Sequence, residues 1–287
     1  MVLMWHGGMR LLLQRRSAAR YAAFGSSPLL YQYSTSAPSS SPSPAAAQTH
    51  NFAFSGSGFL ISYHLGVAQG LHESGFLTPQ SKVAGASGGS ITALAIAADV
   101  DLLEIHDEAK KMVALCREEG TLWKLEARLR VIFNQIFAST SVDVLNKRLT
   151  IVTQQVWPKR QTERWDHFDS IADAGNAVIA SCYIPFYLAR QGATKFRDGF
   201  HVDGGLLDLV PDIPGYVKVC AFHATMLRRK DYAISPSLVP NFPYSIWELA
   251  RASLVPPDAA MLDELFEWGK QSAFLWAAAQ KSEEQAK

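Results

Sequence analysis

From Asn51 onward, short apolar runs alternate with stretches in which apolar residues recur at helical spacing. The runs 52–54 and 82–84 are typical of short buried strands, and glycines follow each of them. The spacing predicts a helix over 59–74, and 91–98 is apolar on nearly all sides, as in a helix packed against a sheet. This order of strand, turn and helix predicts an α/β sheet with crossover helices.

The rest of the chain continues this alternation, with more helix in the middle. The pattern predicts helices over 101–116, 121–137, 141–148 and 170–181, strands over 149–156 and 217–222, a hairpin over 195–202, and C-terminal helices over 246–254 and 259–279. Ser170 is placed to cap the helix that follows it, and Asp198-Gly199 is placed to form the hairpin turn. A chain of 287 residues is long enough to bury a sizeable core.

Composition excludes several classes of protein. The chain is 48% hydrophobic and 18% charged with a net charge of +1, which argues against nucleic-acid binding and against a wholly disordered chain. Its apolar runs fall short of the roughly 20 residues of a membrane-spanning helix. The cysteines Cys116, Cys182 and Cys220 are far apart, so they predict neither a disulfide framework nor a zinc site and read as buried small residues in a reducing compartment.

Charge divides the chain into segments. No acidic residue precedes Glu73, and four arginines give the stretch before it +4, so the remainder carries −3. Residues 26–47 are rich in Ser, Pro and Ala, and an Arg- and Ser-rich segment without acids is typical of an organelle transit peptide. We expect a leader over 1–50 with a mitochondrial address, a catalytic domain over 51–220, and a helical extension packed on it over 221–287. A plastid address is the alternative, as is the cytoplasm or a lipid droplet if the leader is only a disordered tail.

The clearest chemical signal is Gly85-Ala86-Ser87-Gly88-Gly89. It follows a predicted strand and precedes a buried helix, which is the setting of a nucleophile elbow. The nucleophile there has strained backbone geometry, so the residues two before and two after it must be small, and both are glycine. The start of a helix also favours developing negative charge. Ser87 is therefore the candidate nucleophile, the alternative being a tight turn whose serine only caps the helix.

A second glycine turn, Gly56-Ser57-Gly58, lies between the first predicted strand and helix. Its N–H groups are expected to converge on the same end of the sheet, because glycine lets a backbone approach a ligand closely, and they are candidates for binding an oxyanion. A dinucleotide-binding loop needs a further glycine where Ile61 stands. Nucleotide binding is therefore not expected.

A nucleophilic serine needs a proton acceptor. Histidines that follow Ser87 lie in no obvious loop signature: His106, His167, His201 and His223. Asp203 is the stronger candidate because it ends an apolar strand and precedes two glycines, Gly204 and Gly205. A carboxylate held in an apolar, water-poor site has a raised pKa and can act as a base. The alternative is that Asp203-Gly204 only forms a turn.

Three motifs occur in a fixed order: Gly56-Ser-Gly-Phe-Leu60 with Tyr63-His64, then Gly85-Ala-Ser-Gly-Gly89, then Asp203-Gly-Gly205. In this order they resemble the patatin-like phospholipase family, closest to the branch that includes adipose triglyceride lipase and adiponutrin. The resemblance runs from about Phe52 to Val219. It implies a three-layer α/β/α sandwich with a nucleophile elbow, and a Ser-Asp dyad that uses no histidine.

The resemblance also assigns roles. It casts Ser87 as the nucleophile and Asp203 as the proton acceptor. The remaining family positions are the oxyanion hole, formed by Gly56, Ser57, Gly58 and Gly88, and the motif glycines Gly85, Gly89, Gly204 and Gly205. Two positions depart from the family pattern, since Ile61 replaces a third glycine and Leu209 replaces an asparagine that often precedes the following proline. The basic residue of the plant-type loop is also missing. His64, inside the first helix, is read as structural.

The implied function is a serine lipid acyl hydrolase that cleaves triacylglycerols or phospholipids through an acyl-serine intermediate, with no metal or cofactor. The same chemistry permits transacylation. One alternative is an α/β-hydrolase triad that uses Asp203 or Asp208 with His223; another is a weakly active lipid-surface protein that regulates other lipases. Peripheral contact with a membrane or lipid droplet is expected, and the candidate segments are 11–13, 183–187 and the helix with Trp268 and Trp276.

Overall fold

The computed structural model describes residues 49–286, so the predicted leader and the candidate membrane contact at 11–13 lie almost wholly outside the described residues. The described strands form one mixed sheet in the order β5-β6-β3-β2-β1-β7-β8, with β4 paired to β3. They are β1 (Asn51–Phe54), β2 (Val83–Ala86), β3 (Leu149–Trp157), β4 (Gln161–Trp165), β5 (Thr194–Phe196), β6 (Gly199–Val202), β7 (Tyr216–Val219) and β8 (Tyr232–Ile234).

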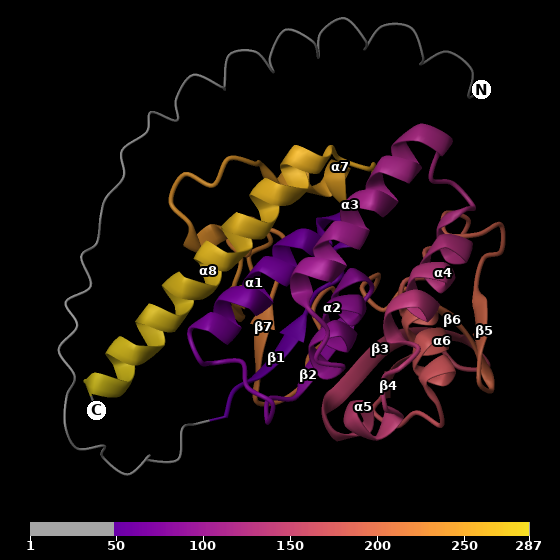
Figure 1. Ribbon diagram of the computed structural model, residues 1–287, viewed down its shortest axis with the longest axis horizontal. Coiled ribbons are helices and arrows are strands. Elements are labelled where there is room, and N and C mark those ends of the chain that lie inside the picture. Colours follow the sequence, from indigo (N-terminus) through magenta and orange to yellow (C-terminus); the bar gives the residue numbers. More distant parts are fainter. Residues whose placement is uncertain (1–48, 287) are drawn as a thin grey trace, which may run out of the picture. The chain divides into compact units, whose positions relative to one another are not determined.

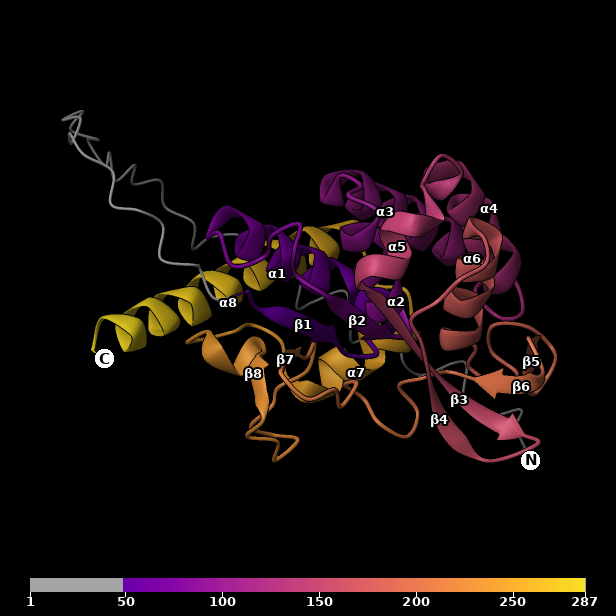
Figure 2. The ribbon, with the colours of Figure 1, turned by 90° about the horizontal axis from the view of Figure 1, so that it is seen from below.

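Helices lie on both sides of this sheet (Figures 1 and 2). They are α1 (Ile61–Glu73), α2 (Gly88–Ala97), α3 (Leu102–Glu119), α4 (Leu125–Phe137), α5 (Val142–Arg148), α6 (Ile171–Ser181), α7 (Ile246–Leu254) and α8 (Ala259–Gln285), with short 3-10 turns at Gly58–Leu60 and Pro236–Leu238. The predicted α/β sandwich is therefore confirmed. Within residues 49–286, no helix combines the length and the apolar character needed to cross a membrane.

Strand β1 shows how the sequence builds the core. Its last three residues are fully buried: Phe52 and Phe54 join the large hydrophobic cluster under the helices, whereas Ala53 faces a smaller cluster around Val210 and Cys220. Successive residues of a strand point to opposite faces. A continuous apolar run is therefore what a strand covered on both faces requires.

The segment after residue 220 packs closely on the first helix. Helix α8 runs alongside α1 (Figure 1), and the two backbones approach so closely that a Cβ on Gly66 would lie 1.9 Å from the Phe266 carbonyl oxygen. The Tyr63 hydroxyl donates to Ser272 Oγ at 2.9 Å. This segment also adds strand β8 to the sheet, beside β7, so it contributes more than helices.

Two tryptophans proposed as membrane contacts are packed inside this arrangement. Trp276 is 7% exposed and meets Phe52 and Phe76 edge to face. Trp268 is half-buried, and its ring lies 5.9 Å from that of Phe242. The helical spacing of these aromatic residues reflects core packing, so the structure gives no support to this part of the expectation.

Candidate active site

Ser87 occupies a sharp turn between β2 and α2. Its backbone has φ 52° and ψ −131°, a left-handed conformation that is strained for a residue with a Cβ. Neighbouring glycines make the turn possible, since a Cβ on Gly85 would lie 2.1 Å from the Gly89 carbonyl oxygen and one on Gly89 would lie 2.4 Å from that of Phe54. The predicted strand–turn–helix geometry is therefore present, and both flanking positions require glycine.

Strand pairing explains why Asp203 lies opposite Ser87. Strand β2 ends with Ala86 paired to Val152 of β3, and β6 ends with Val202 paired to Gln154. Strand β4 pairs with residues 151–155 of β3, a stretch that overlaps both of these pairings. Since a strand has two edges, β4 occupies one edge of β3, and β2 and β6 both lie along the other. One is parallel to β3 and the other antiparallel, so their carboxyl ends meet head-on. The residues that follow these ends are the two candidate catalytic residues.

The Ser87 side chain lies beside the Asp203 carboxylate and favours its ionised form, and the carboxylate accepts a hydrogen bond from the Gly205 N–H at 2.7 Å. Asp203 is 3% exposed. Burial raises the pKa of Asp203 from an ordinary value of 3.8 to about 6, against the opposing effects of Ser87 and the Gly205 N–H. A carboxylate with this pKa is ionised near neutral pH yet basic enough to accept a proton from a reacting hydroxyl.

The glycines after Asp203 allow this approach. A Cβ on Gly204 would lie 2.1 Å from the Val152 carbonyl oxygen, and one on Gly205 would lie 3.2 Å from the Gly56 Cα. The backbone is held on both sides, because the Asp203 N–H donates to the Tyr183 carbonyl at 2.8 Å and the Gly204 N–H donates to that of Ser181 at 3.0 Å. The segment after β6 is thus clamped between α6 and the turn at Gly56.

The predicted oxyanion turn lies at this same end of the sheet. A Cβ on Gly56 would lie 3.6 Å from that of Ser87, and one on Gly88 would lie 3.3 Å from the Gly58 nitrogen. The Gly56 N–H already donates to the Leu209 carbonyl at 2.7 Å, so it is not free to bind an oxyanion. Among the described hydrogen bonds, the N–H groups of Ser57, Gly58 and Gly88 have no protein acceptor. These three are the available donors.

No histidine joins Ser87 and Asp203 within the described residues. The contacts of His223 are with other residues: its Nε2 lies 2.8 Å from the Tyr244 carbonyl oxygen, and its ring meets that of Phe242. The geometry therefore does not form the alternative Ser-Asp-His triad with His223.

His64 has a structural setting. It is fully buried, and its Nε2 lies 3.2 Å from Ser55 Oγ. Ser55 in turn donates to the Gly56 carbonyl at 2.9 Å. Burial lowers the pKa of His64 from 6.5 to about 3, so the imidazole is neutral at physiological pH.

An apolar cleft of about 130 Å³ opens beside Ser87 and Gly88. One wall is a face of α3 and the other is a face of α4, and the residues between 182 and 188 and Ser253 complete it. Helix α4 has an apolar stripe, yet only Leu125 and Phe137 of its residues are fully buried. The stripe lines the cleft and also packs on the core through Leu129 and Ile136, so the cleft offers an apolar surface next to the candidate nucleophile.

Ser181 is a site residue that the sequence did not indicate. Its hydroxyl donates to the Val152 carbonyl at 2.6 Å and accepts the Ser87 N–H at 2.9 Å. Nothing in the local sequence distinguishes it, because it only ends a predicted helix. The cleft wall did have a signal, namely the amphipathic pattern of 125–137, but that pattern is the same for a helix against a core.

Cys182 lines the cleft and is buried. Burial, and then the nearby Asp203 carboxylate, raise the pKa of its thiol well above the usual range. Cys116 and Cys220 are also buried and free, as expected from the sequence. Within residues 49–286, no group of three or more His, Cys, Asp or Glu side chains could hold a metal ion.

A protein-family model described as Patatin-like phospholipase matches residues 52–211, more than half of the chain. Patatin-like phospholipase domain-containing protein 2 of Bos taurus is 29% identical over 175 residues, which cover 57% of this chain and 35% of that protein. The human omega-hydroxyceramide transacylase is 22% identical over 251 residues, which cover 79% of this chain and 45% of that protein. The human 1-acylglycerol-3-phosphate O-acyltransferase PNPLA3 is 25% identical over 247 residues, which cover 78% of this chain and 50% of that protein. The chain thus spans half or less of the length of these relatives.

The crystal structure of VipD from Legionella pneumophila aligns with 61% of this chain and 50% of its own, with a TM-score of 0.39 and 15% identity. A similarity of this size supports no inference about the site.

Proposed function

The chain belongs to the patatin-like phospholipase family, and from this premise we propose that it is a serine acyl hydrolase of lipid esters, with Ser87 as nucleophile and Asp203 as proton acceptor. The observation that carries the proposal is that these two buried side chains are brought together at the head-on ends of β2 and β6. The apolar cleft beside them suits a long acyl chain, as found in triacylglycerols and phospholipids.

The proposed reaction has two halves. Ser87 Oγ attacks the ester carbonyl carbon while its proton passes to Asp203, and the N–H groups of Gly58 and Gly88 stabilise the oxyanion. The carbon–oxygen bond to the alcohol then breaks, and Asp203 returns the proton to the leaving alkoxide. In the second half, water loses a proton to Asp203 and attacks the acyl-serine carbonyl carbon. The bond between that carbon and Ser87 Oγ then breaks, the acid is released, and Asp203 returns the proton to Ser87 Oγ.

Acyl transfer is the second candidate function. Two relatives carry the names transacylase and O-acyltransferase, and the acyl-serine intermediate is common to both outcomes. If an alcohol rather than water enters after the first half, the acyl group moves to that alcohol with the same proton path through Asp203. Product analysis with and without a glycerol-based alcohol distinguishes the two, since hydrolysis releases free acid and transfer forms a new ester.

The test of the proposed function is ester hydrolysis by the full chain and three variants. We expect Ser87→Ala and Asp203→Asn to lower kcat for triacylglycerol or phospholipid by at least about 1000-fold. Asp198→Asn, an acid-to-amide change at an exposed position, should leave it unchanged. A folded parent protein without any turnover would instead favour the alternative of a weakly active lipid-surface protein.

Two further expectations belong to this proposal. The substrate is insoluble, so we propose peripheral contact with a membrane or lipid droplet, for which the segment 183–187 is the remaining described candidate. Exposed Phe186 lies in it, 64% accessible. We also propose a mitochondrial location on the basis of the Arg-rich, acid-free leader. Fusion of residues 1–50 to a fluorescent protein tests the location, and diffuse fluorescence would contradict it.

A further inference from the structure

The α3 wall of the cleft has one small residue between two large ones. Ile105, Ala109 and Met112 all line the cleft, and their spacing of four and three places them in a row on one face of the helix. Ala109 has the smallest side chain of the α3 residues that line the cleft. A larger side chain there would project into the space beside the chain-binding surface of α4.

The α4 wall is long and apolar. Leu125, Leu129, Ile132 and Ile136 line the cleft in a single stripe, which extends over about 16 Å of helix at 1.5 Å per residue. A wall of this length suits a long acyl chain better than a short one. The end of α4 is closed, because Phe137 is 2% exposed and lines the same cleft.

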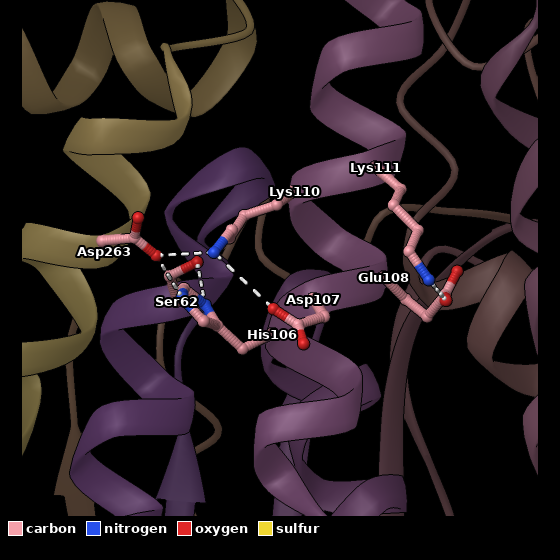
Figure 3. A network of polar contacts seen from close by, with 7 residues as sticks. All are labelled: Ser62, His106, Asp107, Glu108, Lys110, Lys111 and Asp263. Atoms are coloured by element: carbon pink, nitrogen blue, oxygen red, sulfur yellow. Dashed lines mark hydrogen bonds and ion pairs between the residues drawn. The ribbon is translucent and has the colours of Figure 1, made fainter.

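The other side of α3 is fixed to two helices by polar contacts (Figure 3). His106 Nδ1 lies 3.1 Å from Ser62 Oγ of α1, and its Nε2 lies 2.9 Å from Asp263 Oδ1 of α8. Lys110 Nζ donates to the same carboxylate oxygen at 2.9 Å. These residues include the types of a catalytic triad, but Ser62 is fully buried within α1, so the network is structural. Its effect is to hold the α3 wall in place.

On these grounds we infer that the cleft between α3 and α4 is a rigid binding site for one extended long acyl chain, and that Ala109 determines its selectivity for chain length. The inference rests on the proposed function for its substrate class. A chain bound to Ser87 lies along the apolar stripe of α4 and passes Ala109 before it meets the closed end at Phe137. Short acyl chains end before this point and are insensitive to the side chain at position 109.

The experiment compares two variants of the full chain that carry the same substitution. Ala109→Phe places a ring in the cleft, and Ala114→Phe places it on an exposed position of the same helix. We expect Ala109→Phe to lower kcat/KM for 4-nitrophenyl palmitate at least tenfold and to leave that for 4-nitrophenyl butyrate within twofold. Ala114→Phe should match the parent with both esters. Equal losses of both esters, or no loss, would overturn the inference while leaving the hydrolase function intact.

A binding measurement covers the case of an inactive parent. Calorimetric titration of the Ser87→Ala chain with laurate should give saturable binding, and adding Ala109→Phe should weaken it at least tenfold. Ala114→Phe in the same background should not change the Kd. If the parent shows no turnover but laurate binds with this pattern, the hydrolase function is refuted and the acyl-chain site in the cleft is supported. If laurate does not bind, or binds with the same Kd after Ala109→Phe, the proposed acyl-chain site is refuted.

Discussion

Ser181 Oγ accepts a hydrogen bond from the backbone N–H of Ser87 at 2.9 Å. The same hydroxyl donates to the Val152 carbonyl of β3 at 2.6 Å. Ser87 has a left-handed backbone conformation, so its N–H is turned away from the ordinary partners of a strand or helix. Ser181 supplies the missing acceptor from α6 and ties the elbow to the central strand.

Replacing Ser181 with alanine should therefore affect both stability and turnover. The Ser87 N–H would be buried without an acceptor, and a loss of about 1–3 kcal/mol in the free energy of unfolding is expected. A misplaced nucleophile should also lower kcat by roughly tenfold or more. Urea unfolding and ester hydrolysis measure the two effects. Ser282→Ala is the control, since that exposed hydroxyl only bonds the Ala278 carbonyl of its own helix; an equal effect of the two variants would contradict the prediction.

Local sequence was sufficient to predict much of this fold. The predicted ends of two helices, the one that follows Ser170 and the one that ends before Pro256, lie close to those of α6 and α7 in the structure. Ser170 caps α6, because its side chain accepts a hydrogen bond from the Asp173 N–H at 3.1 Å. The elbow at Ser87 was predictable because steric limits on its neighbours leave only small residues. These features depend on contacts within a few residues, which a sequence pattern records directly.

The parts that were not predicted depend on contacts distant in sequence. Strand β4 reads Gln-Thr-Glu-Arg-Trp and has no buried face, so no alternation marks it, and β8 has only three residues. The use of the Gly56 N–H by Leu209 is equally invisible, since 153 positions separate the two residues. The sequence motif placed Gly56 in the oxyanion hole, but tertiary structure determines which of its N–H groups stay free.

Ser57 in the oxyanion turn and Ser55 just before the turn should respond differently to replacement by alanine. Ser57 Oγ is buried and has no hydrogen-bond partner among the described residues, so Ser57→Ala removes an unsatisfied group and should leave stability unchanged or raise it by about 1 kcal/mol. Ser55 Oγ bonds the Gly56 carbonyl and the Ala221 N–H, so Ser55→Ala should lower stability by about 1–3 kcal/mol. Thermal and urea unfolding report both changes. Destabilisation by Ser57→Ala as large as that by Ser55→Ala would show that Ser57 has a partner.

His223→Ala should retain activity. The imidazole contacts the Tyr244 carbonyl and the ring of Phe242, not the candidate dyad, so kcat is expected to stay within about threefold of the parent. A triad would lose several orders of magnitude on the same change. Stability is the internal control, because loss of the Tyr244 contact should lower the unfolding free energy by about 1 kcal/mol even when turnover is unaffected.

Activity and stability should depend on pH in opposite directions through Asp203. The carboxylate must be ionised to accept the Ser87 proton, so kcat/KM should rise with pH through about 6. Stability follows the reverse course. The folded-state pKa of Asp203 lies above the unfolded value, so the native state binds the proton more tightly. The stability that this proton contributes is fully present below about pH 4 and is lost as pH rises through 6. Asp203→Asn should therefore be more stable than the parent at pH 8, by up to about 3 kcal/mol, and nearly equal to it at pH 3.5, while it has lost activity at both. Urea titrations of the two proteins at these two pH values provide the measurement. A stability difference that does not change with pH would show that Asp203 titrates normally, and would remove the reason to treat it as the base.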